Sequence, residues 1–133
     1  MTGQAVDLFG AYQRTGRLDL LNAAIELFRD AVTGTPSDHP DRPAYLYILG
    51  GALRVRFERT GQLADLDEAI TVGRDAVAAT PPGHPDRPLY LSDLSATLRA
   101  RFERAGQQAD LDEAITTART LSLIHISEPT RPY

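Results

Sequence analysis

Apolar residues recur every three or four positions along most of the chain, the spacing of the buried face of an amphipathic α-helix. Residues 46–57 contain one such face, and a second face with smaller side chains follows at 66–77. The first consists of Leu46, Leu49, Leu53 and Phe57, and the second of Leu66, Ala69, Ile70, Gly73, Ala76 and Val77. Residues 1–120 contain no alternating pattern typical of β-strands. We therefore predict an all-α chain with helices over residues 2–15, 18–34, 42–60, 65–80, 87–105 and 110–124.

Short signals at the ends of these segments support the predicted boundaries. Asp41 suits an N-cap, and Pro43 is tolerated in a first helical turn, where its missing N–H costs nothing. Gly61 suits the left-handed residue that ends a helix. Asp65 with Glu68 three residues later is close to a capping box and predicts the start of the second helix.

Three motifs show that this pair of helices is repeated. Each occurs twice at an offset of 45 residues: His-Pro-Asp-Arg-Pro at 39–43 and 84–88, Arg-Phe-Glu-Arg at 56–59 and 101–104, and Asp-Leu-Asp-Glu-Ala-Ile at 65–70 and 110–115. A diverged earlier copy is visible, because residues 12–16 correspond to 57–61. A two-helix unit cannot bury its apolar faces alone, but about three stacked units can. We expect a solenoid of about three antiparallel helix hairpins, with units over about residues 1–36, 37–81 and 82–120.

A spaced set of small and apolar residues in the second helix of each unit ends in proline. The set is Ala24, Phe28, Ala31 and Pro36 in the first unit, and Ala69, Gly73, Ala76 and Pro81 in the second. This arrangement resembles tetratricopeptide repeats, in a long variety similar to arrays found in actinobacterial and fungal CHAT-domain or signalling proteins. The resemblance implies a right-handed superhelical solenoid over residues 1–120.

The resemblance also implies a function. It indicates a protein–protein interaction scaffold, a fragment of a longer repeat protein that binds a peptide or protein partner in its concave groove. In the alternative, the repeats are the regulatory or sensor arm of a larger enzyme or signalling protein, such as a CHAT-type caspase-like protease, with catalysis outside this fragment.

The groove positions of the family, carried over to this chain, imply six partner-binding residues. They are Tyr47, Arg54, Glu58, Ser92, Arg99 and Glu103, and Gly51 and Ala96 occupy two further groove positions. We expect Arg54 and Arg99 to lie in one groove, where guanidinium groups clamp a carboxylate of an acidic partner with two hydrogen bonds. In the alternative, the arginines of residues 54–59 and 99–104 lie on a solvated face and form local ion pairs, for which Glu58, Glu103 and the acidic residues of the next helix are available.

Two other motifs have a structural interpretation that outweighs a catalytic one. His39 and His84 suggest metal ligands, but they lie one repeat apart, which is too far for a shared zinc ion. The acidic residues at 65–68 and 110–113 suggest paired carboxylates, but we interpret them as charges that favour a helix N-terminus. We therefore expect no catalytic residue, no metal and no cofactor, and predict that the chain is not an enzyme.

Composition narrows the class of partner. The 133 residues contain no Cys and carry a net charge of −4, which excludes a disulfide framework and argues against nucleic acid. No apolar run approaches the roughly 18 residues of a membrane span, and no secretory leader is visible. We expect a cytoplasmic protein that contacts neither nucleic acid nor membrane.

The repeat stops abruptly near residue 120. Residues 121–133 resemble an in-frame translation of the transposase adapter used in short-read sequencing libraries. We interpret them as a non-native tail and expect the natural protein to continue with further units. Because repeat arrays need polar capping units, we expect self-association through an uncovered apolar stripe. Its members are Leu111, Ala114, Ile115 and Ala118.

Overall fold

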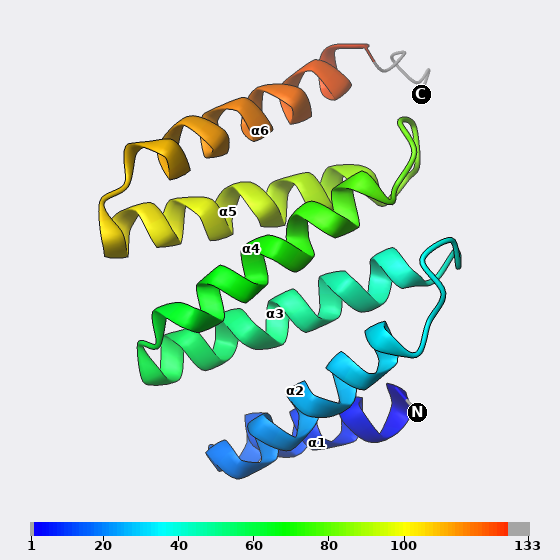
Figure 1. Cartoon of the computed structure of the whole chain (residues 1–133), viewed down its shortest axis with the longest axis vertical. Helices are drawn as coiled ribbons and strands as arrows, with labels where there is room; N and C mark the ends of the chain where they lie inside the picture. Colours follow the sequence, from blue (N-terminus) through cyan, green and yellow to red (C-terminus); the bar gives the residue numbers. More distant parts are fainter. Residues whose placement is uncertain (1, 128–133) are drawn as a thin grey trace, which may run out of the picture.

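The computed structural model describes residues 2–127, and within this range the chain forms six α-helices and no β-strand. The helices are α1 (Thr2–Thr15), α2 (Leu18–Thr33), α3 (Arg42–Thr60), α4 (Leu63–Ala78), α5 (Arg87–Ala105) and α6 (Gln108–Ser127). They pair as the hairpins α1–α2, α3–α4 and α5–α6, which follow one another from the bottom to the top of Figure 1. The all-α prediction is confirmed.

The second helix of each later unit begins earlier than the sequence signals predict. Helix α4 starts at Leu63 and α6 at Gln108, so that Asp65 lies inside the first turn of α4. The expected capping box is wrong, because Gln62 precedes α4 and makes no side-chain cap hydrogen bond. Asp41 precedes α3 as predicted, but its side chain makes no cap hydrogen bond either.

The turn inside each later unit is set by a left-handed glycine. Gly61 has a φ of 74°, and its backbone N–H donates to the carbonyl oxygen of Phe57 at 2.7 Å. Gly106 repeats this geometry with a φ of 75° and the carbonyl of Phe102. Residues with a Cβ rarely adopt this conformation, which is why glycine stands there. The predicted helix end at Gly61 is confirmed.

The last helix is longer than expected. Helix α6 continues to Ser127, whereas the apolar pattern predicts an end at residue 124. Part of the segment interpreted as a non-native tail is therefore helical, and residues 128–133 lie outside the described residues.

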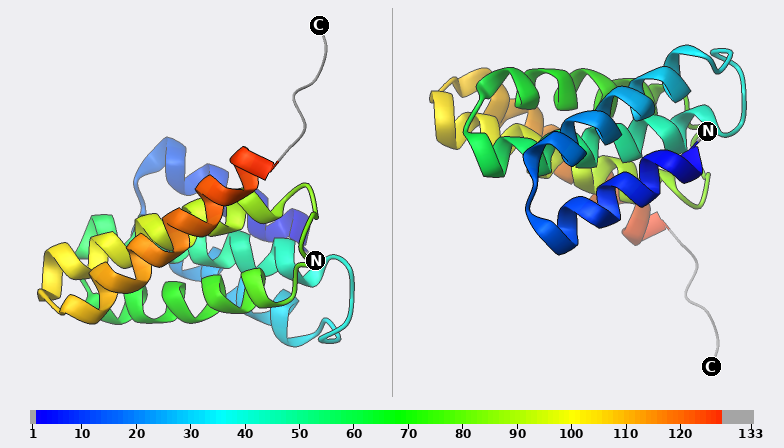
Figure 2. Two further views of the ribbon diagram at one scale, coloured as in Figure 1. Left: turned by 90° about the horizontal axis from the view of Figure 1, so that it is seen from above. Right: turned by 90° about the horizontal axis from the view of Figure 1, so that it is seen from below.

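The two predicted apolar faces form the core. Leu46, Leu49 and Leu53 of α3 are at most 2% exposed, and Leu66 and Ile70 of α4 are at most 1% exposed. Each helix packs most closely against its neighbours in the chain. In Figure 2, α2 and α4 lie along one side of the molecule and α1 lies on the other. The core therefore runs between successive helices.

Glycines allow α4 to approach the first helices on both sides of it. A Cβ at Gly50 of α3 would lie 3.3 Å from Val72 Cγ2, and a Cβ at Gly73 of α4 would lie 3.3 Å from Leu94 Cδ1. Such distances are tight for a carbon–carbon contact, whose optimum is about 3.5–4.0 Å. The small residues of α4 thus bring α3 and α5 close to it, and α4 joins two units.

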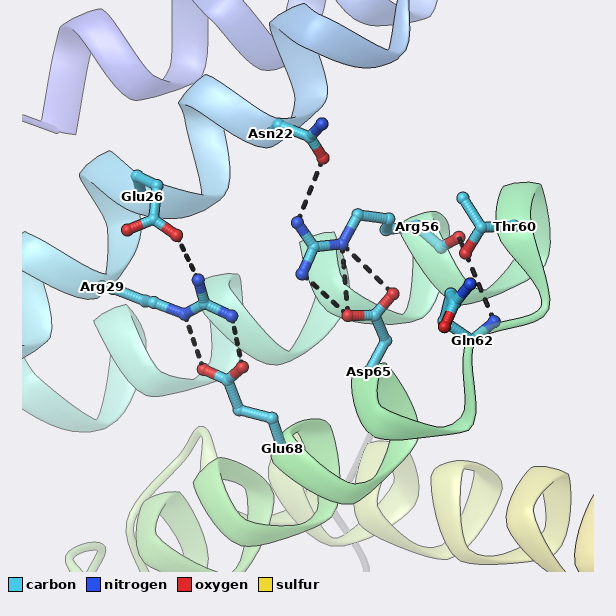
Figure 3. A network of polar contacts seen from close by, with 8 residues as sticks. All are labelled: Asn22, Glu26, Arg29, Arg56, Thr60, Gln62, Asp65 and Glu68. Atoms are coloured by element: carbon cyan, nitrogen blue, oxygen red, sulfur yellow. Dashed lines mark hydrogen bonds and ion pairs between the residues drawn. The ribbon is translucent and has the colours of Figure 1, made fainter.

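A nearly buried ion pair ties the two helices of a unit together. The guanidinium of Arg56 in α3 donates to both carboxylate oxygens of Asp65 in α4, with a closest distance of 2.8 Å (Figure 3). Arg101 and Asp110 repeat this pair between α5 and α6 at 2.7 Å. Each aspartate side chain is 7% exposed. The acidic residue in the first turn thus fastens the hairpin, instead of capping its helix.

Replacing Asp65 by Asn tests this pair. The change leaves a largely buried guanidinium without its counter-charge, so we expect the free energy of unfolding to fall by about 2–3 kcal/mol, measured by urea denaturation. Asp19→Asn is the matched control, because Asp19 is also a first-turn residue paired to an arginine, but both side chains of that pair are 65% exposed. There we expect a loss below about 1 kcal/mol. Equal losses would contradict the proposed role of the buried pair.

Candidate functional site

An apolar hollow lies where the first helices of the three units approach one another. It has a volume of about 260 Å³ and is lined by residues of α1, α2, α3 and α5. The lining residues are Phe9, Phe28, Tyr47, Ile48, Gly51, Ala52, Val55 and Asp93. Only Tyr47 and Asp93 contribute polar side chains, so the hollow is suited to apolar groups.

The hollow exists because the first unit departs from the repeat. Phe9 occupies the position that Arg54 holds one unit later, and Ile48 occupies the position of Asp93. Between the second and third units these positions form an ion pair, in which Arg54 donates to Asp93 at 2.5 Å. Between the first and second units they are apolar, and Ile48 remains 38% exposed. A polar bridge at one junction is thus replaced by an open apolar surface at the other.

Gly51 leaves the floor of the hollow without a side chain. A Cβ built at Gly51 meets no atom within 4 Å, although one at the adjacent Gly50 would press against Val72. Phe28 of α2 is 4% exposed and is among the lining residues of the hollow. The aromatic ring of Tyr47 lies 5.3 Å from that of Tyr90 at an angle of 44°, a tilted arrangement that helps to hold Tyr47 in place.

The size of the hollow favours a side chain over a small molecule. Sites for drug-sized ligands measure about 300–1,000 Å³ and carry a few convergent polar groups. This hollow is smaller, and its one charged lining residue, Asp93, is already paired with Arg54. What fits is an apolar side chain projecting from a larger molecule.

The residues expected to bind a partner are only partly brought together. Tyr47 lines the hollow, as does Gly51, whereas Arg54 is tied to Asp93. The structure thus differs from the expectation that Arg54 is free to clamp a ligand carboxylate, because a carboxylate of the next unit already engages it. The remaining four residues are exposed and are not among the lining residues: Glu58, Ser92, Arg99 and Glu103.

Burial dominates the electrostatics of Asp93. It raises the pKa of the Asp93 carboxyl above its ordinary value, and the Arg54 guanidinium lowers it less than burial raises it. The ion pair therefore does not fully offset the loss of solvent around the carboxylate. Sequence reasoning missed Asp93 and most of the hollow, although the exchange of an Arg–Asp pair for Phe9 and Ile48 was visible in the aligned repeats.

The histidine motif has a local structural role. His39 Nδ1 accepts a hydrogen bond from the backbone N–H of Asp41 at 3.0 Å, and His84 Nδ1 does the same for Asp86. Both histidines line a second hollow of about 580 Å³ between the two connecting loops. Among the side chains that the structure describes, those of residues 3–124, no group of three or more His, Asp or Glu is arranged to hold a metal ion. The bonds to Asp41 and Asp86 close the turns that precede α3 and α5.

The acidic cluster at the start of α4 is divided among three arginines. Asp65 pairs with Arg56 of the same unit, and Glu68 accepts two hydrogen bonds from Arg29 of the preceding unit (Figure 3). Asp67 pairs with Arg101 of the following unit at 3.0 Å. Arg56 thus forms an ion pair with an acidic residue of the next helix, but in a nearly buried position and not on a solvated face. The carboxylates serve to connect helices.

No family model, no curated protein and no solved structure matches the chain. Among the helices that the structure describes, none is both long and apolar enough to cross a membrane. Interpretation of the site therefore depends on its own geometry.

The two neighbouring glycines of α3 provide a test of the hollow. Alanine is the better helix former by about 0.8–1.0 kcal/mol, and at Gly51 its methyl group enters open space. We expect Gly51→Ala to raise the free energy of unfolding by about 0.5–1 kcal/mol in urea denaturation. Gly50→Ala is the control, because its Cβ would lie 3.3 Å from Val72 Cγ2, and it should stabilise less or destabilise. The opposite ranking would show that position 51 is not open.

The raised pKa of Asp93 predicts how stability depends on pH. A carboxyl that holds its proton more firmly in the folded state makes stability fall as pH rises from 3.8, its ordinary pKa, through the folded-state pKa. We expect wild type to lose stability relative to Asp93→Asn across this window, measured by urea denaturation of both proteins from about pH 3.5 to 7. A change of opposite sign would show that Arg54 outweighs burial.

Proposed function

We propose that this chain is a protein–protein interaction module, a segment of a right-handed tetratricopeptide-like solenoid whose apolar hollow receives an apolar side chain of a partner protein. The observation that supports this most directly is the lining of the hollow by the half-buried Phe9 and Tyr47 and the exposed Ile48. Aromatic side chains at the centre of an interface, in a pocket that excludes water, commonly supply most of its binding energy.

Two features favour a protein partner over a small substrate. The hollow is below the usual size of small-molecule sites, and its one charged lining residue is neutralised within the protein. A helix or extended segment of a partner protein can place one apolar side chain in the hollow while its backbone stays outside. A site of this size and lining suits such a side chain. The surrounding repeat frame holds the lining residues in fixed positions, because they come from three different hairpins.

The pairing of Arg54 changes the expected mode of recognition. Its guanidinium is engaged by Asp93, so we assign the central contact to the apolar residues around Tyr47 and Gly51. The exposed residues Glu58 and Ser92 would then contribute at the rim, where polar contacts add selectivity more than affinity.

Peptide selection tests this proposal with a defined probe. Random 12-residue peptides displayed on phage are selected on the wild-type protein, and the strongest binder is synthesised and titrated by fluorescence anisotropy. We expect an aromatic or branched aliphatic residue to be essential in it, and Gly51→Leu to weaken its binding at least tenfold, about 1.4 kcal/mol, because the leucine fills the hollow. Gly51→Ala is the control for changes in α3 itself and should retain most of the affinity. Equal binding to wild type and Gly51→Leu would refute the hollow as the site.

A further inference from the structure

The outward face of α6 is uncovered at a position that is buried in both preceding units. Ile25 and Ile70 are equivalent residues of the first and second units, and both are 0% exposed. Ile70 is covered by Leu94 and Leu98 of the next unit. The third equivalent residue, Ile115, is 42% exposed. This repeated position is thus built to lie beneath the first helix of a following hairpin.

The junction between the second and third units carries three ion pairs. Arg54 pairs with Asp93 at 2.5 Å, and Arg74 pairs with Glu113 at 2.5 Å. In the third pair the second unit supplies the carboxylate, because Asp67 accepts a hydrogen bond from Arg101 of the third unit at 3.0 Å. The earlier junction repeats part of this pattern, with Arg29 bonded to Glu68 and Arg56 bonded to Asn22. The second unit therefore presents two arginines and one acid to the third unit, whereas the first presents one arginine and one amide to the second.

The third unit presents the same three groups, but they have no such partners. Arg99, Arg119 and Asp112 lie 45 residues after Arg54, Arg74 and Asp67, and all three are exposed. In the described part of the chain, neither Arg99 nor Arg119 forms an ion pair within 4.0 Å. The Asp112 carboxylate accepts only a hydrogen bond from the Gln108 amide, at 3.1 Å. The exposed Ile115 and the charged groups of Arg99, Arg119 and Asp112 thus lie at the positions that face the next unit in the earlier repeats.

The opposite end of the molecule does not match this face. Where later units place Leu49 or Leu94 against the preceding helix, the first unit has the exposed Gln4, and where they have Ala52 or Thr97 it has the exposed Asp7. The acidic partners are missing as well, since Gly3 corresponds to Asp93 and Ala23 corresponds to Glu113. A second copy of this chain, docked head to tail, would offer Ile115 the polar Gln4 beside Leu8, where a matching hairpin offers two leucines, and no carboxylate at either position.

We propose that the outward face of α5–α6, formed by Ile115, Arg99, Arg119 and Asp112, binds one further helical hairpin of the same repeat pattern. The first helix of that hairpin places a leucine over Ile115, a carboxylate at Arg99 and an arginine at Asp112. Its second helix places a carboxylate at Arg119. The apolar contact supplies most of the affinity, and the partly exposed charges fix the register, because such pairs contribute little energy individually. This surface is separate from the apolar hollow, so the inference does not depend on the proposed function.

A peptide from the chain itself is a suitable probe. Residues 80–120 contain a complete hairpin with Asp93, Arg101 and Glu113 at the required positions. We expect a fluorescently labelled peptide of these residues to bind the full-length protein saturably, with affinity that falls as salt rises. Arg99→Glu combined with Arg119→Glu should weaken binding at least tenfold, and a peptide with Asp93→Arg and Glu113→Arg should restore it.

Arg54→Gln combined with Arg74→Gln is the matched control. If the peptide docks on the outward face, this pair of changes leaves its affinity nearly unaltered. If the peptide instead displaces the native α5–α6 hairpin, affinity depends on Arg54 and Arg74 and not on Arg99 and Arg119, and that result overturns the proposal.

A covalently joined hairpin provides a second measurement that does not depend on the peptide folding alone. In the fused protein, residues 1–120 are followed directly by an added copy of residues 76–120. We expect a higher urea midpoint than in the original protein, and a loss of that gain on Arg99→Glu with Arg119→Glu. No gain in midpoint overturns the proposal. Concentration-dependent dimerisation of the wild-type protein that is abolished by the same two changes also overturns it, in favour of a second copy as the occupant.

Discussion

A single hairpin of this chain leaves one face of its second helix uncovered, and only the next hairpin covers it. Ile70 is fully buried because Leu94 and Leu98 of α5 lie over it, and Gly73 permits that approach by lacking a side chain. Buried residues of successive units therefore pack together, and each unit depends on a neighbour to cover its apolar face. The packing of each helix against the next also fixes the relative positions of the residues that line the apolar hollow.

Ion pairs between arginine and a carboxylate connect the same helices in two different ways. Arg56 and Asp65 join the helices within a hairpin, whereas Arg29 and Glu68 join successive hairpins. The hydrogen bond to Glu68 raises the pKa of Arg29, which shows how strongly the charged form is favoured there. The repeat copies both of these pairs 45 residues later, as Arg101–Asp110 and Arg74–Glu113. Such networks contribute more to the register of helices than an isolated exposed pair contributes to stability.

Sequence reasoning predicts the helices and the core well, because both depend on local spacing. The apolar positions of α3 and α4 follow from their three- and four-residue intervals, and Gly61 follows from the conformation that ends α3. The partner of Arg54 was not predicted, since Asp93 lies 39 residues away and the contact depends on how two hairpins pack. The role of Asp65 was misassigned for a related reason. Its first-turn position suggested a cap, but Arg56 of the facing helix binds its carboxylate.

The hollow was not predicted from the sequence, because it results from side chains that are absent. No residue type marks it, and it arises where Gly51 lacks a side chain and where Phe9 and Ile48 replace an arginine and an aspartate. In a repeated chain, the positions that all units share describe the frame, and the positions at which one unit differs describe surfaces that only that unit has. The first unit differs at the hollow. On its outer face, Gln4 stands where later units have leucine, and Gly3 and Ala23 stand where the third unit has acidic residues. The same comparison therefore distinguishes two surfaces: the apolar hollow beside Gly51, and the face of α6 at which Ile115 is 42% exposed although Ile25 and Ile70 are buried.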